Sequence, residues 1–98
     1  MVTFRLIYRR ALNESYREGR LSKEDYEVLL DAYKRPYRHN EKGEKIDLMA
    51  EVEKKTRRHA RGWPEIWAWI KENWVLILKL LFSLLPLFVM VDPKQPQD

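Results

Sequence analysis

The chain has 98 residues, a formal net charge of +4 and no cysteine. This length allows one small domain, and residues 1–62 alone are near the lower size limit for an independent core, which argues against an enzyme with a deep pocket. The absence of cysteine excludes disulfides, thiolate metal sites and cysteine nucleophiles. His39 and His59 lack the spacing of metal ligands, so we expect both to be solvated and no metal or other cofactor to be bound.

The first predicted unit is a helical hairpin over residues 1–35. Apolar residues recur at helical spacing over residues 3–18, and Gly19 then supplies a left-handed C-terminal position. Ser22 is a suitable N-cap for a second helix over residues 23–34. A joint this short favours an antiparallel pair. One face of the second helix is predicted to contact a protein partner or a second copy through Tyr26, Leu29, Leu30 and Tyr33.

The stretch GRLSKEDYE, from Gly19 to Glu27, follows a helix that contains Leu12 and resembles the short helical hairpin called SHOCT. The shared pattern is a glycine, one residue, an aliphatic, Ser or Thr, one residue, two acids, an aromatic and often Glu. The resemblance covers residues 11–35. It implies a hairpin of two helices and a role in oligomerisation, and it brings no catalytic residue.

Residues 36–44 are predicted to be a loop, because Pro36, Asn40 and Gly43 lie among charges without periodicity. A basic linker helix is predicted for residues 45–62. Its last part is expected to contact anionic lipid or other phosphate groups through five cations, Lys54, Lys55, Arg57, Arg58 and Arg61. By the positive-inside rule these cations place the N-terminal part in the cytoplasm. Acidic residues are interleaved throughout and no base-recognition motif is present, so nucleic acid is not an expected partner.

All four tryptophans lie within residues 63–74. Indole rings prefer the boundary between membrane and water, because they combine a large apolar body with one N–H group. Residues 63–73 are therefore predicted to form an interfacial segment, and the membrane-interface residues are Trp63, Trp67, Trp69 and Trp74. The alternative is that these tryptophans pack against the hairpin.

Residues 74–91 (WVLILKLLFSLLPLFVMV) form an apolar run that is interrupted only by Lys79, Ser83 and Pro86. Eighteen helical residues rise about 27 Å, close to the ~30 Å hydrocarbon core of a bilayer. The Leu, Ile, Val and Phe residues of the run favour insertion by at most about 4 to 8 kcal/mol, against about 3 kcal/mol for Lys79 at the centre. The run is therefore predicted to be a transmembrane helix with Lys79 as an intramembrane polar residue, followed by a disordered tail, residues 92–98. The alternative is a buried central helix in a soluble oligomer.

The predicted fold class is all-α, with an N-terminal helical hairpin, a linker helix and one C-terminal transmembrane helix. The C-terminus is then expected on the side of the membrane opposite to the cytoplasmic N-terminus. No catalytic arrangement or phosphate-binding loop is recognised, which predicts a non-enzyme.

The favoured function is a single-pass, tail-anchored protein whose head mediates protein interaction or homo-oligomerisation at the bilayer. A membrane-permeabilising effector, such as a phage holin, a lysis protein or a toxin, is the alternative. A membrane tether for nucleic acid is a weaker one.

Overall fold

The structure is a computed structural model that describes residues 2–40 and 42–85 of the chain. Five helices and one two-stranded ribbon make up this part. Helical residues predominate, so the all-α prediction is confirmed at the level of fold class.

The N-terminal hairpin has the bounds that its capping residues predict. Helix α1 (Phe4–Arg17) begins after Thr3, whose side chain accepts a hydrogen bond from the Leu6 amide. Gly19 has a φ of 79°, which lets the chain reverse after α1 without strain. The Ser22 hydroxyl accepts from the Asp25 amide at 3.1 Å and starts helix α2 (Lys23–Lys34).

A short antiparallel ribbon follows the hairpin, where the sequence predicted a loop and the start of a helix. Strand β1 (Tyr37–His39) pairs with β2 (Lys45–Asp47), and Tyr37 lies opposite Asp47. The turn between them is held by the Asn40 carboxamide oxygen, which accepts from the Glu44 amide, and by Gly43 with a φ of 81°. Strands of three residues are too short to show an alternating pattern, so the loop prediction for residues 36–44 was wrong at β1.

Helix α3 (Leu48–Arg57) is shorter than the predicted linker helix at both ends. Asp47 caps its first turn by accepting from the Ala50 amide at 3.2 Å, which explains why the helix begins three residues later than predicted. The buried residues of α3 form a stripe on one side, namely Leu48, Met49, Val52 and Thr56.

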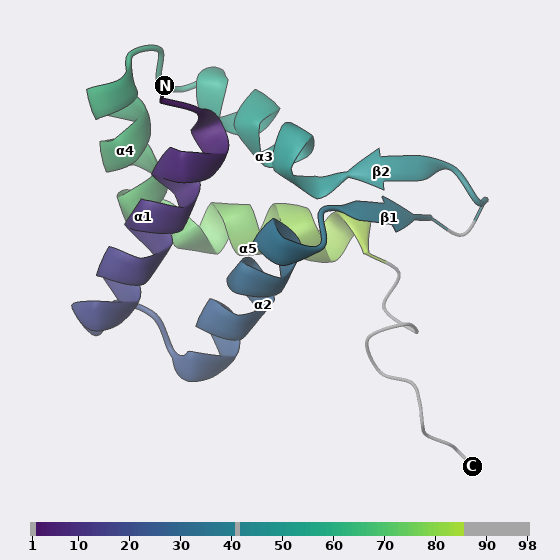
Figure 1. Ribbon diagram of the computed structural model, residues 1–98, viewed down its shortest axis with the longest axis horizontal. Coiled ribbons are helices and arrows are strands. Elements are labelled where there is room, and N and C mark those ends of the chain that lie inside the picture. Colours follow the sequence, from purple (N-terminus) through teal and green to yellow (C-terminus); the bar gives the residue numbers. More distant parts are fainter. Residues whose placement is uncertain (1, 41, 86–98) are drawn as a thin grey trace.

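The last two helices are separated by a single residue. Helix α4 (Trp63–Glu72) packs against α1, and helix α5 (Trp74–Leu84) packs against α2, α3 and α4. Asn73 lies between them with φ −129° and ψ 34°, outside helical geometry. Figure 1 shows α5 running through the middle of the molecule, with α3 on one side and α2 on the other.

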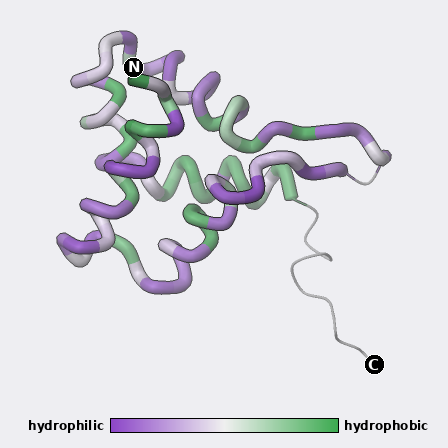
Figure 2. Tube along the Cα trace, in the orientation of Figure 1, coloured by the Kyte–Doolittle hydropathy of each residue, from purple (hydrophilic) through white to green (hydrophobic). Residues whose placement is uncertain are grey.

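The predicted transmembrane helix is a core helix over the part that the structure describes. Four residues of α5 are buried among the other helices, namely Trp74, Ile77, Leu78 and Leu81. Figure 2 shows this hydrophobic segment enclosed by helices that alternate hydrophilic and hydrophobic residues. The helix ends at Leu84, so the predicted single helix over residues 74–91 is corrected here, and residues 86–91 lie outside the described residues. No helix within residues 2–40 and 42–85 combines the length and hydropathy needed for a bilayer crossing.

Candidate membrane-contact surface

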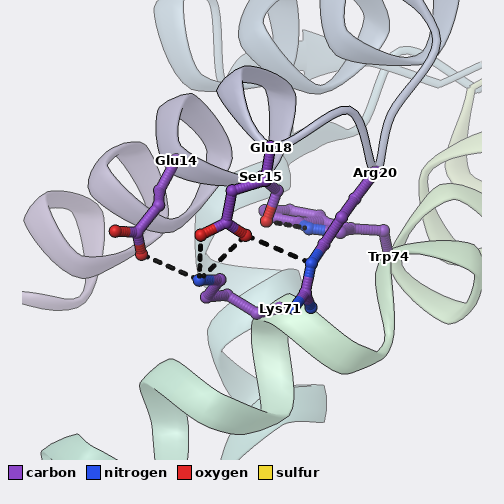
Figure 3. Close-up of polar contacts among 6 residues, drawn as sticks. All are labelled: Glu14, Ser15, Glu18, Arg20, Lys71 and Trp74. Carbon is purple, nitrogen blue, oxygen red and sulfur yellow. Dashed lines mark hydrogen bonds and ion pairs between the residues drawn. The ribbon is translucent and has the colours of Figure 1, made fainter.

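A polar cluster joins α1 to the C-terminal pair of helices, as Figure 3 shows. The Lys71 ammonium lies 2.8 Å from a Glu14 carboxylate oxygen and 3.4 Å from a Glu18 oxygen, and Arg20 lies 3.1 Å from Glu18. In the same region the Trp74 indole Nε1 donates to the buried Ser15 hydroxyl at 2.9 Å. These contacts fix α4 and the start of α5 on α1.

Glu14 and Lys71 of this cluster shift each other's pKa. The hydrogen bond from Lys71 holds the pKa of Glu14 below its ordinary value of 4.5, and the hydrogen bond to Glu14 raises the pKa of Lys71 above 10.5. The Glu14 contribution to stability is therefore present above about pH 4.5 and is lost as the pH falls through the lowered pKa. The Lys71 contribution is present below about pH 10.5 and is lost as the pH rises through the raised pKa.

Lys71→Gln is expected to make the melting temperature depend less on pH in the acid range. In the variant the pKa of Glu14 returns toward its ordinary value, so acidification from pH 5 to pH 3 is expected to lower the melting temperature less than in the parent protein. Lys79→Gln is the matched control, because Lys79 is an exposed cation of α5 without an ion pair among residues 2–40 and 42–85. Melting temperatures across the pH range measure the effect, and identical profiles for all three proteins would contradict it.

The four tryptophans do not form one exposed belt. Trp74 is only 5% exposed, and its ring meets the Tyr8 ring edge-on at 5.8 Å. The other three are half-buried along α4: Trp63 lies under the Arg57 guanidinium, Trp67 lies under the Lys71 ammonium, and Trp69 stacks on His59. They pack against the protein on one side and keep partial access to solvent on the other.

The predicted interaction face of α2 is used inside the chain. Leu29 is fully buried, and its carbonyl oxygen accepts from the Tyr8 hydroxyl at 2.8 Å. Tyr26 stacks on Tyr16 with ring centroids 4.1 Å apart. Leu30 and Tyr33 are partly buried against the core. Leu29 is therefore not available to a partner, because α5 and α1 complete the core over this face.

The outward side of α5 brings apolar and cationic residues together. Val75 is 64% exposed and Leu76 is 38% exposed, and the exposed Lys79 lies one turn further along the same side. Leu80 lines a small hollow of about 160 Å³ that α3 completes with Glu51, Lys54, Lys55 and Arg58. We call this region the α5–α3 surface and define it as Val75, Leu76, Lys79 and Leu80 of α5 with Lys54 and Lys55 of α3 and its C-cap residue Arg58.

The basic cluster predicted from the sequence is divided by the fold. Lys54, Lys55 and Arg58 belong to the α5–α3 surface, with Glu51 4.0 Å from Lys54. Arg57 instead pairs with Glu53 at 2.8 Å and covers the Trp63 ring, and Arg61 is exposed in the turn before α4. The surface therefore carries four cations, counting Lys79, against the single carboxylate of Glu51.

An apolar groove of about 490 Å³ lies on the other side of α5, between α5 and α2. Its floor consists of Val28, Ala32, Leu81 and Leu85. The Asp31 carboxylate at its edge is held by Arg35 at 2.8 Å and by Arg38 at 2.6 Å, so this acid is neutralised within the fold. Across the described ranges, no group of three or more His, Cys, Asp or Glu is arranged to hold a metal ion.

Comparisons with known proteins place the chain in no group. No family model matches it, and neither curated proteins nor solved structures give a match. The likeness of residues 11–35 to SHOCT hairpins therefore stays a resemblance of sequence pattern.

Proposed function

We propose that the protein is a non-enzymatic helical module that binds the surface of an anionic bilayer through the α5–α3 surface. The observation that carries this proposal is that the outward side of α5 exposes Val75 and Leu76 together with Lys79, and that Leu80 of the same helix lines a hollow with Lys54, Lys55 and Arg58. Apolar side chains enter the boundary between head groups and acyl chains, and nearby cations are attracted to anionic lipids. The α5–α3 surface thus supplies both the apolar side chains and the cations that binding to an anionic membrane surface requires.

The balance of charge supports an anionic partner. Each Lys or Arg near an anionic leaflet contributes about 1 kcal/mol. Lys54, Lys55, Arg58 and Lys79 offer four cations, and Glu51 offsets one of them. The electrostatic gain is therefore about 3 kcal/mol, to which the burial of Val75 and Leu76 adds.

Binding to the membrane surface leaves the protein core intact. Crossing the bilayer, in contrast, requires α5 to leave that core. If α5 left, its buried side chains would pass into lipid, but Tyr8 and the buried residues of α2 and α3 against which α5 packs, such as Leu29 and Val52, would become exposed to water. Exposing a large aliphatic side chain costs about 1.5 to 3 kcal/mol. The folded head therefore favours contact through the outward side of α5 with its inner side still packed.

A second candidate is a single-pass, tail-anchored protein in which residues 74–91 cross the membrane and the N-terminal part is cytoplasmic. The continuous apolar sequence from Trp74 to Val91 favours it. Alkaline carbonate extraction of membranes from expressing cells separates the two candidates. Release of the full-length protein supports surface binding, and retention in the membrane supports the crossing helix.

Reversing two charges with Lys54→Glu and Lys55→Glu is expected to weaken binding to anionic vesicles by at least about 30-fold, since each lost cation removes about 1 kcal/mol. Flotation of the full-length protein with vesicles of equal parts phosphatidylglycerol and phosphatidylcholine measures the effect. Lys34→Glu with Lys45→Glu is the matched control, because it changes the net charge equally at residues outside the α5–α3 surface. Equal binding to anionic and to pure phosphatidylcholine vesicles, or equal losses in both double variants, would refute the proposal.

A further inference from the structure

Two arginines of α1 are fixed on one tyrosine ring of α2. Arg5 Nη2 donates to the Tyr33 carbonyl oxygen at 3.2 Å, and its guanidinium carbon lies 4.3 Å from the centroid of the Tyr33 ring. Arg9, one helical turn later, lies 5.6 Å from the same centroid. Tyr33 is itself supported by Tyr8, whose ring stacks on it at 6.3 Å. Guanidinium groups held in this way lose little freedom when they bind phosphate oxygens.

A hollow of about 360 Å³ opens beside these arginines. Its walls come from the starts of α1 and α3, the end of α2 and strand β1, through Arg5, Lys34, Pro36, Tyr37, Asp47 and Met49. Figure 1 shows the end of α2 and the start of α3 meeting where β1 and β2 join the helices. We call this the Arg5–Tyr37 hollow, and its lining combines cations with an aromatic ring.

Positive charge dominates at the Arg5–Tyr37 hollow. Lys45 adds a further cation, since its ammonium lies 4.8 Å from the Tyr37 ring. Within residues 2–40 and 42–85, Arg5, Arg9, Lys34 and Lys45 form no ion pair. Asp47 is the one carboxylate in the lining, and it accepts a hydrogen bond from the Ala50 amide as the cap of α3.

The carboxylates at the C-terminal end of α1 lie away from Arg5 and Arg9. Glu14 and Glu18, the two carboxylates at the C-terminal part of α1, both contact Lys71 of α4. Arg5 and Arg9 lie one turn apart on the side of α1 that faces Tyr33, whereas Glu14, nine residues after Arg5, lies on the opposite side of the helix. The charge on the side of α1 next to the hollow is therefore that of Arg5 and Arg9.

We propose that the Arg5–Tyr37 hollow binds single-stranded nucleic acid. Arg5, Arg9, Lys34 and Lys45 contact the phosphodiester backbone, and one base stacks on Tyr37, whose side chain is prominent at 63% exposure. A single strand fits better than a duplex, because only an unpaired base presents its face to an aromatic ring. This site is separate from the α5–α3 surface, with which it shares no residue.

Fluorescence anisotropy with a labelled 20-residue oligothymidylate tests the proposal on the full-length protein. Lys34→Glu with Lys45→Glu is expected to weaken binding at least tenfold at low salt. It is also expected to reduce the slope of log affinity against log salt by about 1.4, which corresponds to two phosphate contacts on a single strand. Lys54→Glu with Lys55→Glu has the same net charge and is expected to retain the parent affinity.

A second variant separates base stacking from simple attraction between charges. Tyr37→Ala removes an exposed ring and is expected to weaken binding of the oligonucleotide by about 5- to 150-fold, in line with the contribution of one stacked base. Binding of inorganic polyphosphate, which has no base, is expected to stay unchanged in this variant. Circular dichroism establishes that each variant is folded before its affinity is compared.

The alternatives give distinct results. Equal losses in the two double variants would mean that only the net charge attracts the oligonucleotide, and the site would be refuted. Failure of the parent protein to bind the oligonucleotide at low salt, or unchanged affinity after Lys34→Glu with Lys45→Glu, would also refute it. Vesicle binding is tested at Lys54 and Lys55, and oligonucleotide binding is tested at Lys34 and Lys45. Failure of one of the two binding activities therefore does not decide the other.

Discussion

Ile77→Ala is expected to lower the free energy of unfolding by about 2 to 5 kcal/mol, because Ile77 is fully buried where α5 meets the surrounding helices. Val75→Ala, two residues earlier, is expected to change it by no more than about 0.5 kcal/mol. The two residues are both β-branched and lie on one helix, but Val75 is 64% exposed. Denaturant unfolding followed by circular dichroism without detergent measures both values.

This pair of substitutions tests whether α5 is a core helix. If lipid surrounded the helix on all sides, the two substitutions would change the free energy of unfolding by similar amounts, since both side chains would contact acyl chains. A difference of several kcal/mol is expected only if one side of α5 is packed against protein. Equal, small effects would contradict the packing of α5 described above.

Trp74→Ala is expected to destabilise the protein by about 3 to 5 kcal/mol, the usual range for a buried aromatic residue. The substitution removes the edge-on contact with Tyr8 and leaves the buried Ser15 hydroxyl without its donor. Trp63→Ala is the matched control, because Trp63 is only half-buried and lies at the start of α4. The midpoints of thermal or denaturant unfolding give the comparison.

The stabilities of the Trp74→Ala and Trp63→Ala variants also distinguish a tryptophan packed in the core from a belt of tryptophans at a membrane interface. If all four indoles were equivalent anchors at a membrane, Trp74→Ala and Trp63→Ala would have similar small effects on stability in solution. A larger loss for Trp74 is expected from its 5% exposure and its hydrogen bond to Ser15. Trp74→Phe is expected to recover part of that loss, since it restores most of the apolar area but not the donor.

The hairpin was predictable because its signals are local. Gly19 and Ser22 each act within a few residues, and the structure places both at helix ends. The ribbon was not predictable in the same way, because strands of three residues carry no periodic pattern. Asp47 gave the one available signal for the start of α3, as a good capping residue before an apolar stripe.

The sequence alone could not decide whether α5 is a membrane helix or a buried core helix, because both of its sides are apolar. A run such as VLILKLLF satisfies the pattern of a membrane helix and that of a buried helix equally well. The choice depends on contacts with distant residues, such as the hydrogen bond from Trp74 to Ser15, 59 residues apart. The ion pair between Lys71 and Glu14 and the position of Arg5 on Tyr33 likewise join segments that no local signal connects.

The non-helical geometry of Asn73 ends α4 and sets the direction of α5. Its side-chain amide donates to the Trp69 carbonyl oxygen at 2.8 Å, which satisfies a group that a continuing helix would have bonded through its own backbone. A single unbroken helix over residues 63–84 would be a rod of about 33 Å, comparable to the thickness of a bilayer's hydrocarbon interior. With the break at Asn73, the same residues form two helices of 10 and 11 residues, each about half that length, and α5 packs among α2, α3 and α4.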